Sequence, residues 1–142
     1  MKITECLAAE HRVFTEQIGL IERAIGDPDL YLDLALKAMV EMLSVPLERH
    51  THTEEEVLFP ALEAHLERTT GPLTVMDAEH QEIRQILDTI SAGQDIRNQA
   101  SRLVGLLQGH IQKEDRVLFP MAEQFFGTET LTHLAEKCSK RC

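Results

Sequence analysis

One eleven-residue pattern occurs twice in this chain, and it constrains the fold and the chemistry more than any other feature. Residues 50–60 and residues 110–120 both read His-x-x-x-Glu-x-x-Val-Leu-Phe-Pro. The tripeptide Ala-Glu-His precedes each copy, at residues 9–11 and 78–80. The chain is therefore one unit written twice. Four histidines and two glutamates repeated in this way indicate a metal site built between two halves.

Apolar residues recur every three or four positions along four long segments, which predicts amphipathic helices. Turn signals separate the segments at residues 26–29, 69–72 and 93, and Gly127 ends the last one. We expect Thr4 to cap the first helix and Thr128 to cap a short C-terminal one. The sequence predicts an all-α protein with an up-down-up-down four-helix bundle over residues 1–127. Residues 128–142 are expected to form a short helical tail that packs on the bundle or extends from it.

Net charge, apolar runs and cysteine count limit the partners and the cellular compartment that we expect for this chain. The net charge of −10 argues against a nucleic-acid surface, which requires a basic face. The longest apolar runs fall well short of the ~20 residues of a membrane span, and early charges argue against a signal peptide. Three cysteines, Cys6, Cys138 and Cys142, do not suggest a disulfide framework. We therefore expect a cytoplasmic protein with no membrane or nucleic-acid partner. The sequence does not identify a protein partner.

The prolines and the unequal helix lengths conflict with a regular four-helix bundle. Pro46 falls inside the second helix and is expected to kink it, while Pro60 and Pro120 should bend or end their helices at matching points. Measured from the first turn, His11 and His50 differ by about six residues, or ~9 Å along a helix axis. The kink or an irregular start of the second helix must absorb this difference.

The repeated polar residues fall where core-facing apolar residues are expected. A single His-x-x-x-Glu more often makes an exposed polar pair on a helix face. Here every member continues an apolar stripe, and unpaired polar groups in a bundle core would cost several kcal/mol each, on the order of 2–7. Metal coordination satisfies such groups more completely than a hydrogen-bonded network does. The predicted metal ligands are His11, His50, Glu54, His80, His110 and Glu114.

The ligand count favours two ions. Four imidazoles fill four coordination positions and two bridging glutamates fill four more, whereas two six-coordinate ions offer about twelve. A shared oxo or hydroxo group would leave about one open position on each ion for a small ligand. The mixed nitrogen and oxygen donor set favours iron, with zinc and manganese as competitors.

At these residues the chain resembles the hemerythrin-like family, also called HHE cation-binding proteins, over about residues 4–126. The resemblance rests on His11, His80 and the two His-x-x-x-Glu motifs, each followed by Leu-Phe-Pro. It implies a non-haem di-iron site (Fe2+/Fe3+, oxo- or hydroxo-bridged) inside a four-helix bundle. The family's tasks include reversible dioxygen binding, redox sensing, peroxide handling, iron sensing and nitric-oxide-linked iron chemistry.

Two departures from the oxygen-carrying members matter. Those members use His-x-x-x-His on the third helix, whereas Arg84 follows His80 here and cannot bind a metal ion. The site thus is similar to the four-histidine, two-glutamate variety linked to iron–sulfur cluster repair, which argues against simple dioxygen carriage. Asp115 is an alternative to Glu114, because carriers take their last carboxylate five residues after a histidine.

The resemblance therefore implies a protein that binds or senses dioxygen, peroxide or nitric oxide at an iron pair. A di-iron enzyme of the peroxidase, nitric-oxide-reducing or cluster-repair type is the alternative. A third possibility, a helical interaction module without metal, predicts equal stability with and without a chelator.

The remaining histidines, acidic residues, phenylalanines and cysteines are not expected to bind the metal ions. His52, His65 and His133 are expected outside the site, and Tyr31 lies too far from it. Glu10 and Glu79 are interpreted first as solvated charges, with a hydrogen bond to a metal-binding histidine as the alternative. The five phenylalanines and Cys6 are expected in the core or lining the pocket. Cys138 and Cys142 are expected to be exposed thiols on the tail, with a redox pair as the alternative.

Overall fold

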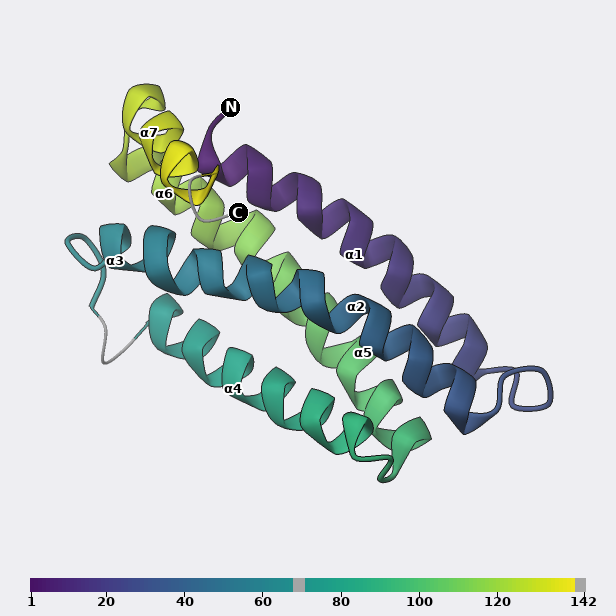
Figure 1. Ribbon diagram of the computed structural model, residues 1–142. Coiled ribbons are helices and arrows are strands. Elements are labelled where there is room, and N and C mark those ends of the chain that lie inside the picture. The colour runs from purple at the N-terminus through teal and green to yellow at the C-terminus, as the bar shows by residue number, and fades with distance from the viewer. Residues whose placement is uncertain (68–70, 140–142) are drawn as a thin grey trace.

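Four long helical segments run antiparallel to their neighbours and form the body of the protein (Figure 1). They belong to a computed structural model that describes residues 1–67 and 71–139. The predicted all-α bundle is confirmed. No helix within these residues combines the length and the apolar character needed to cross a membrane. The elements are α1 (Ile3–Ile25), α2 (Asp33–Thr53) with η1 (Glu54–Leu58) and α3 (Phe59–Leu62), α4 (Pro72–Ser91), α5 (Ile96–Lys113) with η2 (Glu114–Leu118) and α6 (Phe119–Phe125), and α7 (Thr128–Ser139).

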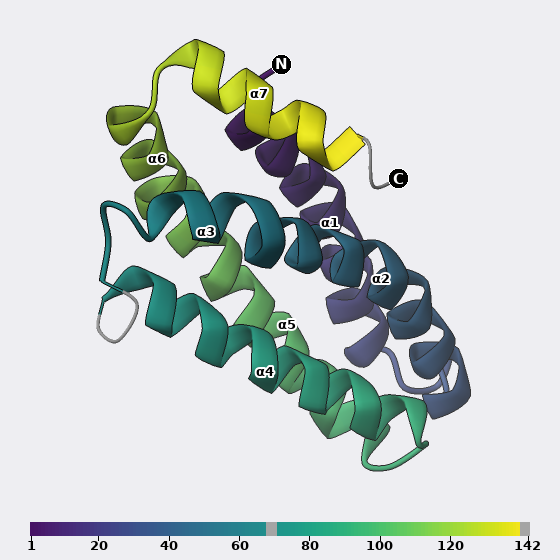
Figure 2. The same cartoon turned by 60° about the vertical axis from the view of Figure 1, so that its left-hand side comes forward.

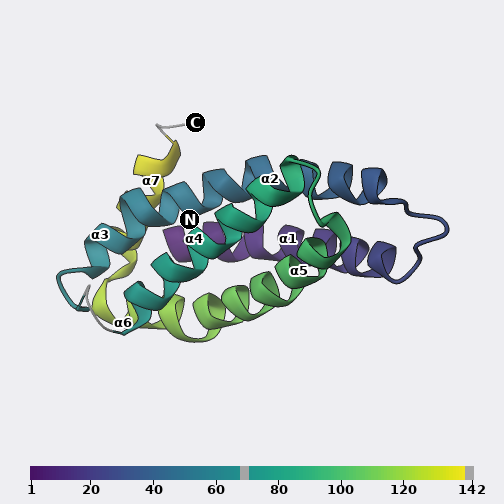
Figure 3. The same ribbon diagram turned by 90° about the horizontal axis from the view of Figure 1, so that it is seen from below.

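The core consists of two apolar clusters with a polar layer between them along the bundle. One cluster contains Phe14 and Leu43 and fills the end near the α1–α2 connection. The other contains Leu7 and Phe59 and fills the end occupied by α3 and α6, which Figure 3 shows from below. Burial of these side chains stabilises the bundle, since each fully buried large apolar group contributes about 1.5–3 kcal/mol. The clusters therefore fix the four helices whose polar residues face one another between them.

The helix starts differ in detail from the sequence expectation. Lys2, not Thr4, precedes the first helical residue, and its backbone N–H donates to Glu5 Oε2 at 3.0 Å. Thr4 is buried inside α1 and donates its hydroxyl to Glu123 Oε1 at 2.9 Å. α4 begins at Pro72 as expected, directly after Gly71, whose φ of 89° suits glycine. The remaining part of that expected turn, Thr69 and Thr70, lies outside the described residues.

The first connection takes up part of the length difference between the halves of the site. α1 ends at Ile25, fourteen residues after His11, and α2 begins only at Asp33, seventeen residues before His50. The remaining difference of three residues corresponds to ~4.5 Å. α2 stays helical through Pro46, so the late start of the helix absorbs half of the predicted mismatch.

Both metal-ligand motifs run into a π-helical turn, at η1 and η2. Phe59 N–H donates to the Glu54 carbonyl and Phe119 N–H to the Glu114 carbonyl, five residues back in each case. Each turn inserts one extra residue and thereby shifts the buried face. Val117, which continues the apolar spacing of its segment, is 48% exposed while Leu118 is buried, whereas Val57 at the same place in the other turn is 5% exposed. Such turns are frequent at functional sites.

The C-terminal helix packs on the bundle. Figure 2 shows α7 beside the N-terminal part of α1, and its Leu131 and Leu134 are buried in the cluster around Leu7. Cys138 also packs against this cluster and its thiol donates to the Leu134 carbonyl, so the expectation of an exposed thiol is wrong for this residue. Cys142 lies outside the described residues. Cys6 is only partly buried, and burial raises the pKa of its thiol.

Candidate metal centre

Four helices bring the predicted ligands to one buried point. α1 contributes His11, α4 contributes His80, and the two repeat motifs contribute a histidine and a glutamate each from α2–η1 and α5–η2. None of these side chains is more than 5% exposed, and the two glutamates are fully buried. The structure thus brings together His11, His50, Glu54, His80, His110 and Glu114, and places no other described histidine among them.

The six side chains form two overlapping groups. One consists of His11 and His50 with the two glutamates, and the other of His80 and His110 with the same two glutamates. Within each group one donor atom from every residue lies within 4.8 Å of the others. Glu54 and Glu114 are therefore placed to bridge two cation positions, each of which has two histidines of its own. A carboxylate has enough lone pairs for such bridging.

The histidine rings turn the same nitrogen inward. His11 Nε2 lies 3.0 Å from His50 Nε2 and 3.1 Å from Glu114 Oε1. His110 Nε2 lies 3.2 Å from Glu114 Oε1. With Nδ1 protonated, as the outer contacts described below require, either a proton or a metal ion must lie between the two Nε2 atoms to separate their lone pairs. Burial acts in the other direction, but the carboxylates of Glu10 and Glu114 raise the pKa of His50, which favours the proton in the metal-free centre.

Several atoms at the centre lack partners within the described chain. Both oxygens of Glu54, Oε2 of Glu114 and Nε2 of His80 are buried without a hydrogen bond. His80 Nε2 and Glu54 Oε1 lie 3.4 Å apart, but not in hydrogen-bonding geometry. Leaving such groups unsatisfied costs about 1–3 kcal/mol each, and more when they are charged. The donor set and its unpartnered atoms fit a pair of metal ions.

The electrostatics of the metal-free centre reflect burial and crowding. Burial and the adjacent Glu114 charge raise the pKa of Glu54 well above its ordinary value, which favours the protonated form of this carboxyl. Burial also acts on Glu114, but its contacts with Glu54 and the inner histidines lower its pKa. Burial and the neighbouring His110 lower the pKa of His80 to about 4, which keeps its lone pair free at neutral pH. Burial and mutual repulsion thus favour one ionised and one neutral carboxyl in the metal-free centre.

Every metal-facing histidine has an outer carboxylate on Nδ1. His50 Nδ1 lies 3.3 Å from Glu10 Oε1, and His110 Nδ1 lies 3.0 Å from Glu79 Oε1. The preferred interpretation of Glu10 and Glu79 as solvated charges is therefore wrong. In metal sites, such carboxylates fix the imidazole tautomer and raise its basicity. Glu10 of α1 thus contacts a histidine of α2, and Glu79 of α4 contacts a histidine of α5.

The other two histidines are supported from the π-helical turns. Asp115 Oδ1 lies 2.8 Å from His11 Nδ1, and Glu55 Oε2 lies 3.2 Å from His80 Nδ1. Asp115, weighed as an alternative metal ligand, thus contacts the outer side of a histidine. Sequence reasoning missed Glu55. The repeat itself contained the signal, because Glu55 and Asp115 occupy the same place in the two copies, directly after Glu54 and Glu114.

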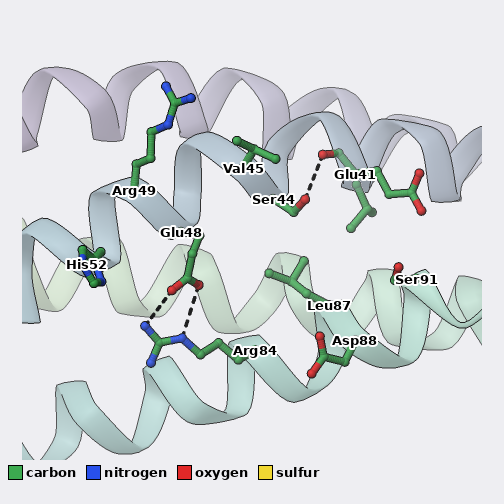
Figure 4. A pocket seen from close by; sticks show the side chains of 11 residues that line it. Glu41, Ser44, Val45, Glu48, Arg49, His52, Arg84, Leu87, Asp88 and Ser91 are labelled. Atoms are coloured by element: carbon green, nitrogen blue, oxygen red, sulfur yellow. Dashed lines mark hydrogen bonds and ion pairs between the residues drawn. The ribbon is translucent and has the colours of Figure 1, made fainter. Parts of the chain in front are cut away.

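The two halves differ in what holds these outer carboxylates. Arg84 donates to both oxygens of Glu55, at 2.6 and 3.1 Å, and to both oxygens of Glu48, at 2.9 and 3.2 Å. Lys113 pairs with Glu79. Burial alone would raise the pKa of Glu55, but its contacts with Arg84 and His80 lower this pKa below its ordinary value. Figure 4 shows Arg84 reaching Glu48 across a groove of about 500 Å³ between α2 and α4. Within the described chain, Glu10 and Asp115 have no such arginine or lysine partner.

The remaining histidines and aromatic residues are largely where the sequence placed them. His52 is exposed and pairs with Glu56, and His65 is exposed and stacks on Phe125. Phe59 stacks on His80 and Phe119 on His11, so these rings cover the centre from the side of α3 and α6. Phe14 and Met76 are buried as expected, whereas Phe125 is 37% exposed.

We expect neutral glutamine at either Glu10 or Glu79 to weaken metal binding by about tenfold or more, because the histidine loses its charged Nδ1 partner. Competition with a chromophoric chelator measures the affinity. The matched control is Glu82→Gln, which removes a carboxylate that pairs with Arg102 on the same helix pair. Equal affinities of Glu79→Gln and Glu82→Gln would contradict the supporting role.

Comparison with known proteins agrees with this geometry. The family model of the hemerythrin HHE cation binding domain matches residues 2–122. The chain belongs to this family. No solved structure matches the chain significantly.

Among curated proteins, this hemerythrin HHE domain is similar to iron-sulfur cluster repair protein YtfE. The protein from Escherichia coli O139:H28 (strain E24377A / ETEC) is 29% identical over 102 residues, covering 61% of this chain and 46% of the relative. The one from Salmonella paratyphi B (strain ATCC BAA-1250 / SPB7) is 31% identical over 91 residues, covering 54% of this chain and 41% of the relative. The matched regions thus span less than half of the relatives' length.

Proposed function

We propose that this hemerythrin HHE domain is a non-haem di-iron protein that binds or senses a small oxidant or gas, namely dioxygen, peroxide or nitric oxide. The observation that carries the proposal is the pair of four-residue groups sharing Glu54 and Glu114. When bound, an iron pair supplies one-electron redox chemistry and open positions for a small ligand.

The chain's own residues define what the centre admits. Phe59 and Phe119 stack on two of the histidines and exclude bulk water from their side of the site. The outer carboxylates hold Nδ1 protons and leave the Nε2 lone pairs directed inward. Glu54 and Glu114 line neither the groove between α2 and α4 nor the pocket formed by α1, η2 and α6, and we expect the centre to take ligands of two to four atoms rather than organic substrates.

The alternative function is a di-iron enzyme, and one specific observation favours it. The similar curated proteins carry the name iron-sulfur cluster repair protein, which points to iron chemistry beyond reversible binding. Arg84 is also engaged by Glu48 and Glu55 and adds no metal ligand on α4.

Reconstitution with ferrous iron under anaerobic conditions, followed by titration with each small molecule, tests both functions. We expect two irons per chain and a new visible absorption that saturates with dioxygen, peroxide or nitric oxide. A single adduct that releases its ligand intact supports binding or sensing, whereas many turnovers per chain support the enzyme. Iron uptake without a response to any of the three would overturn the proposal.

A further inference from the structure

The two sides of the metal centre are not equally closed, although the repeat makes them similar. Around His80 and His110, the outer carboxylates Glu55 and Glu79 are 24% and 13% exposed, and each is held by a cation. Around His11 and His50, the corresponding Asp115 and Glu10 are 39% and 47% exposed. The half of the centre that contains His11 therefore has the more accessible cover.

A pocket of about 350 Å³ lies directly outside His11. Its walls come from the first turns of α1 and from η2 and α6: Thr4, Glu5, Ala8, Arg12, Asp115, Phe119, Pro120 and Glu123. Two of these residues touch the metal-facing histidine itself. Asp115 contacts His11 Nδ1 at 2.8 Å, and the Phe119 ring stacks on His11 with ring centroids 5.3 Å apart. The half-exposed Asp115 carboxylate and the buried Phe119 ring are thus the two groups that lie between the pocket and His11.

The inner end of this path carries unpartnered polar atoms. His11 Nε2 contacts Glu114 Oε1 at 3.1 Å, and Oε2 of the same carboxylate is buried without a hydrogen bond. The pocket is lined by the carboxylates of Glu5, Asp115 and Glu123 and by the Arg12 guanidinium, and Lys2 lies 3.1 Å from Glu123 and 3.9 Å from Glu5. The Asp115 carboxylate, next to His11, has no lysine or arginine partner among the described residues, so it is placed to attract a divalent cation toward His11.

We propose that this pocket is the port through which divalent metal ions enter and leave the centre. The inference rests on the proposed metal site and adds the direction of access. Asp115 acts as the gate, because it holds His11 from the exposed side, while Arg84 and Lys113 keep the opposite side closed. The groove between α2 and α4 in Figure 4 is larger, but Arg84 and Glu48 line it as a pair, and Arg84 also holds Glu55, the outer carboxylate of His80.

Two arginine variants test the port without touching the core. Arg12→Ala removes a cation from the pocket, and Arg49→Ala removes another exposed cation, which lines the groove of Figure 4. Stopped-flow absorption follows uptake of Co²⁺ by the metal-free full chain, and a chelator follows its release. We expect Arg12→Ala to take up Co²⁺ faster, on the order of threefold at low salt, and Arg49→Ala to match the wild type. Equal rates for the two variants would overturn the proposal.

A second pair of variants changes the width of the path. Ala8→Trp fills the pocket, whereas Val45→Trp places the same ring in the α2–α4 groove, where Val45 is 58% exposed. We expect Ala8→Trp to slow both uptake and release of Co²⁺ by about tenfold. Because both rates fall by the same factor, the equilibrium affinity for Co²⁺ should stay unchanged. Uptake by Ala8→Trp at the wild-type rate, or equal slowing by Val45→Trp, would contradict the port. Failure to bind Co²⁺ at all in the wild type would instead reject the metal site.

Discussion

Removing the metal with a strong chelator should lower the midpoint of thermal unfolding by on the order of 10 °C. Ions that bind only the native state stabilise it by about 4 kcal/mol when present at a thousand times their dissociation constant. For a domain of this size, each kcal/mol corresponds to about 2–4 °C. Without ions, the buried atoms of Glu54, Glu114 and His80 remain unpartnered, so the native state loses this contribution.

Differential scanning calorimetry with and without chelator measures the effect. The matched control is the double variant Glu54→Gln, Glu114→Gln, in which both bridging carboxylates are replaced by neutral groups of nearly equal size. We expect its midpoint to be independent of the chelator. A wild-type midpoint that also ignores the chelator would favour a helical interaction module whose polar residues form a hydrogen-bonded network.

Glu54→Ala and Glu114→Ala should each abolish the paired metal site to the same extent. Both carboxylates are fully buried, both belong to the two ligand groups, and they occupy equal positions in the repeat. Losing either one removes a ligand from both ions, so we expect at most one weakly held iron per chain. Elemental analysis after desalting measures the stoichiometry. Two irons retained by either variant would contradict the bridging arrangement.

Glu54→Gln should separate stability from metal binding. A carboxyl whose pKa is raised by folding contributes stability below its unfolded pKa, and this contribution is lost as the pH rises through the folded pKa. At pH 7 the buried Glu54 therefore weakens the metal-free fold. Glutamine avoids this cost, so we expect metal-free Glu54→Gln to gain roughly 1–3 kcal/mol in free energy of unfolding while metal affinity falls. Urea unfolding checks the gain, and a loss of stability would reject the sign.

The sequence was sufficient for the architecture and for the residues now found at the centre. Periodicity located the helices, and the internal repeat selected the six side chains that the structure brings together. The same periodicity failed at Val117, which lies in the π-helical turn η2 and is exposed, although Val57 at the same place in η1 is buried. Helical periodicity alone does not distinguish these two positions.

The contacts of the outer carboxylates could not be predicted from the sequence alone. Glu10 and Glu79 lie beside a ligand in the sequence but contact the histidine of a neighbouring helix. Only the packing of the helices decides whether such a residue faces solvent or a partner. Glu55 and Asp115 could have been noticed, since an acidic residue follows the ligand glutamate in both copies of the repeat. Position in a repeat thus indicated chemistry more reliably than charge alone.

Anomalous diffraction from crystals loaded with ferrous iron tests the central claim most directly. We expect two iron peaks bridged by Glu54 and Glu114, one coordinated by His11 and His50 and the other by His80 and His110. A single peak, or peaks confined to surface carboxylates with the inner imidazoles unoccupied, would contradict a di-iron centre in this bundle.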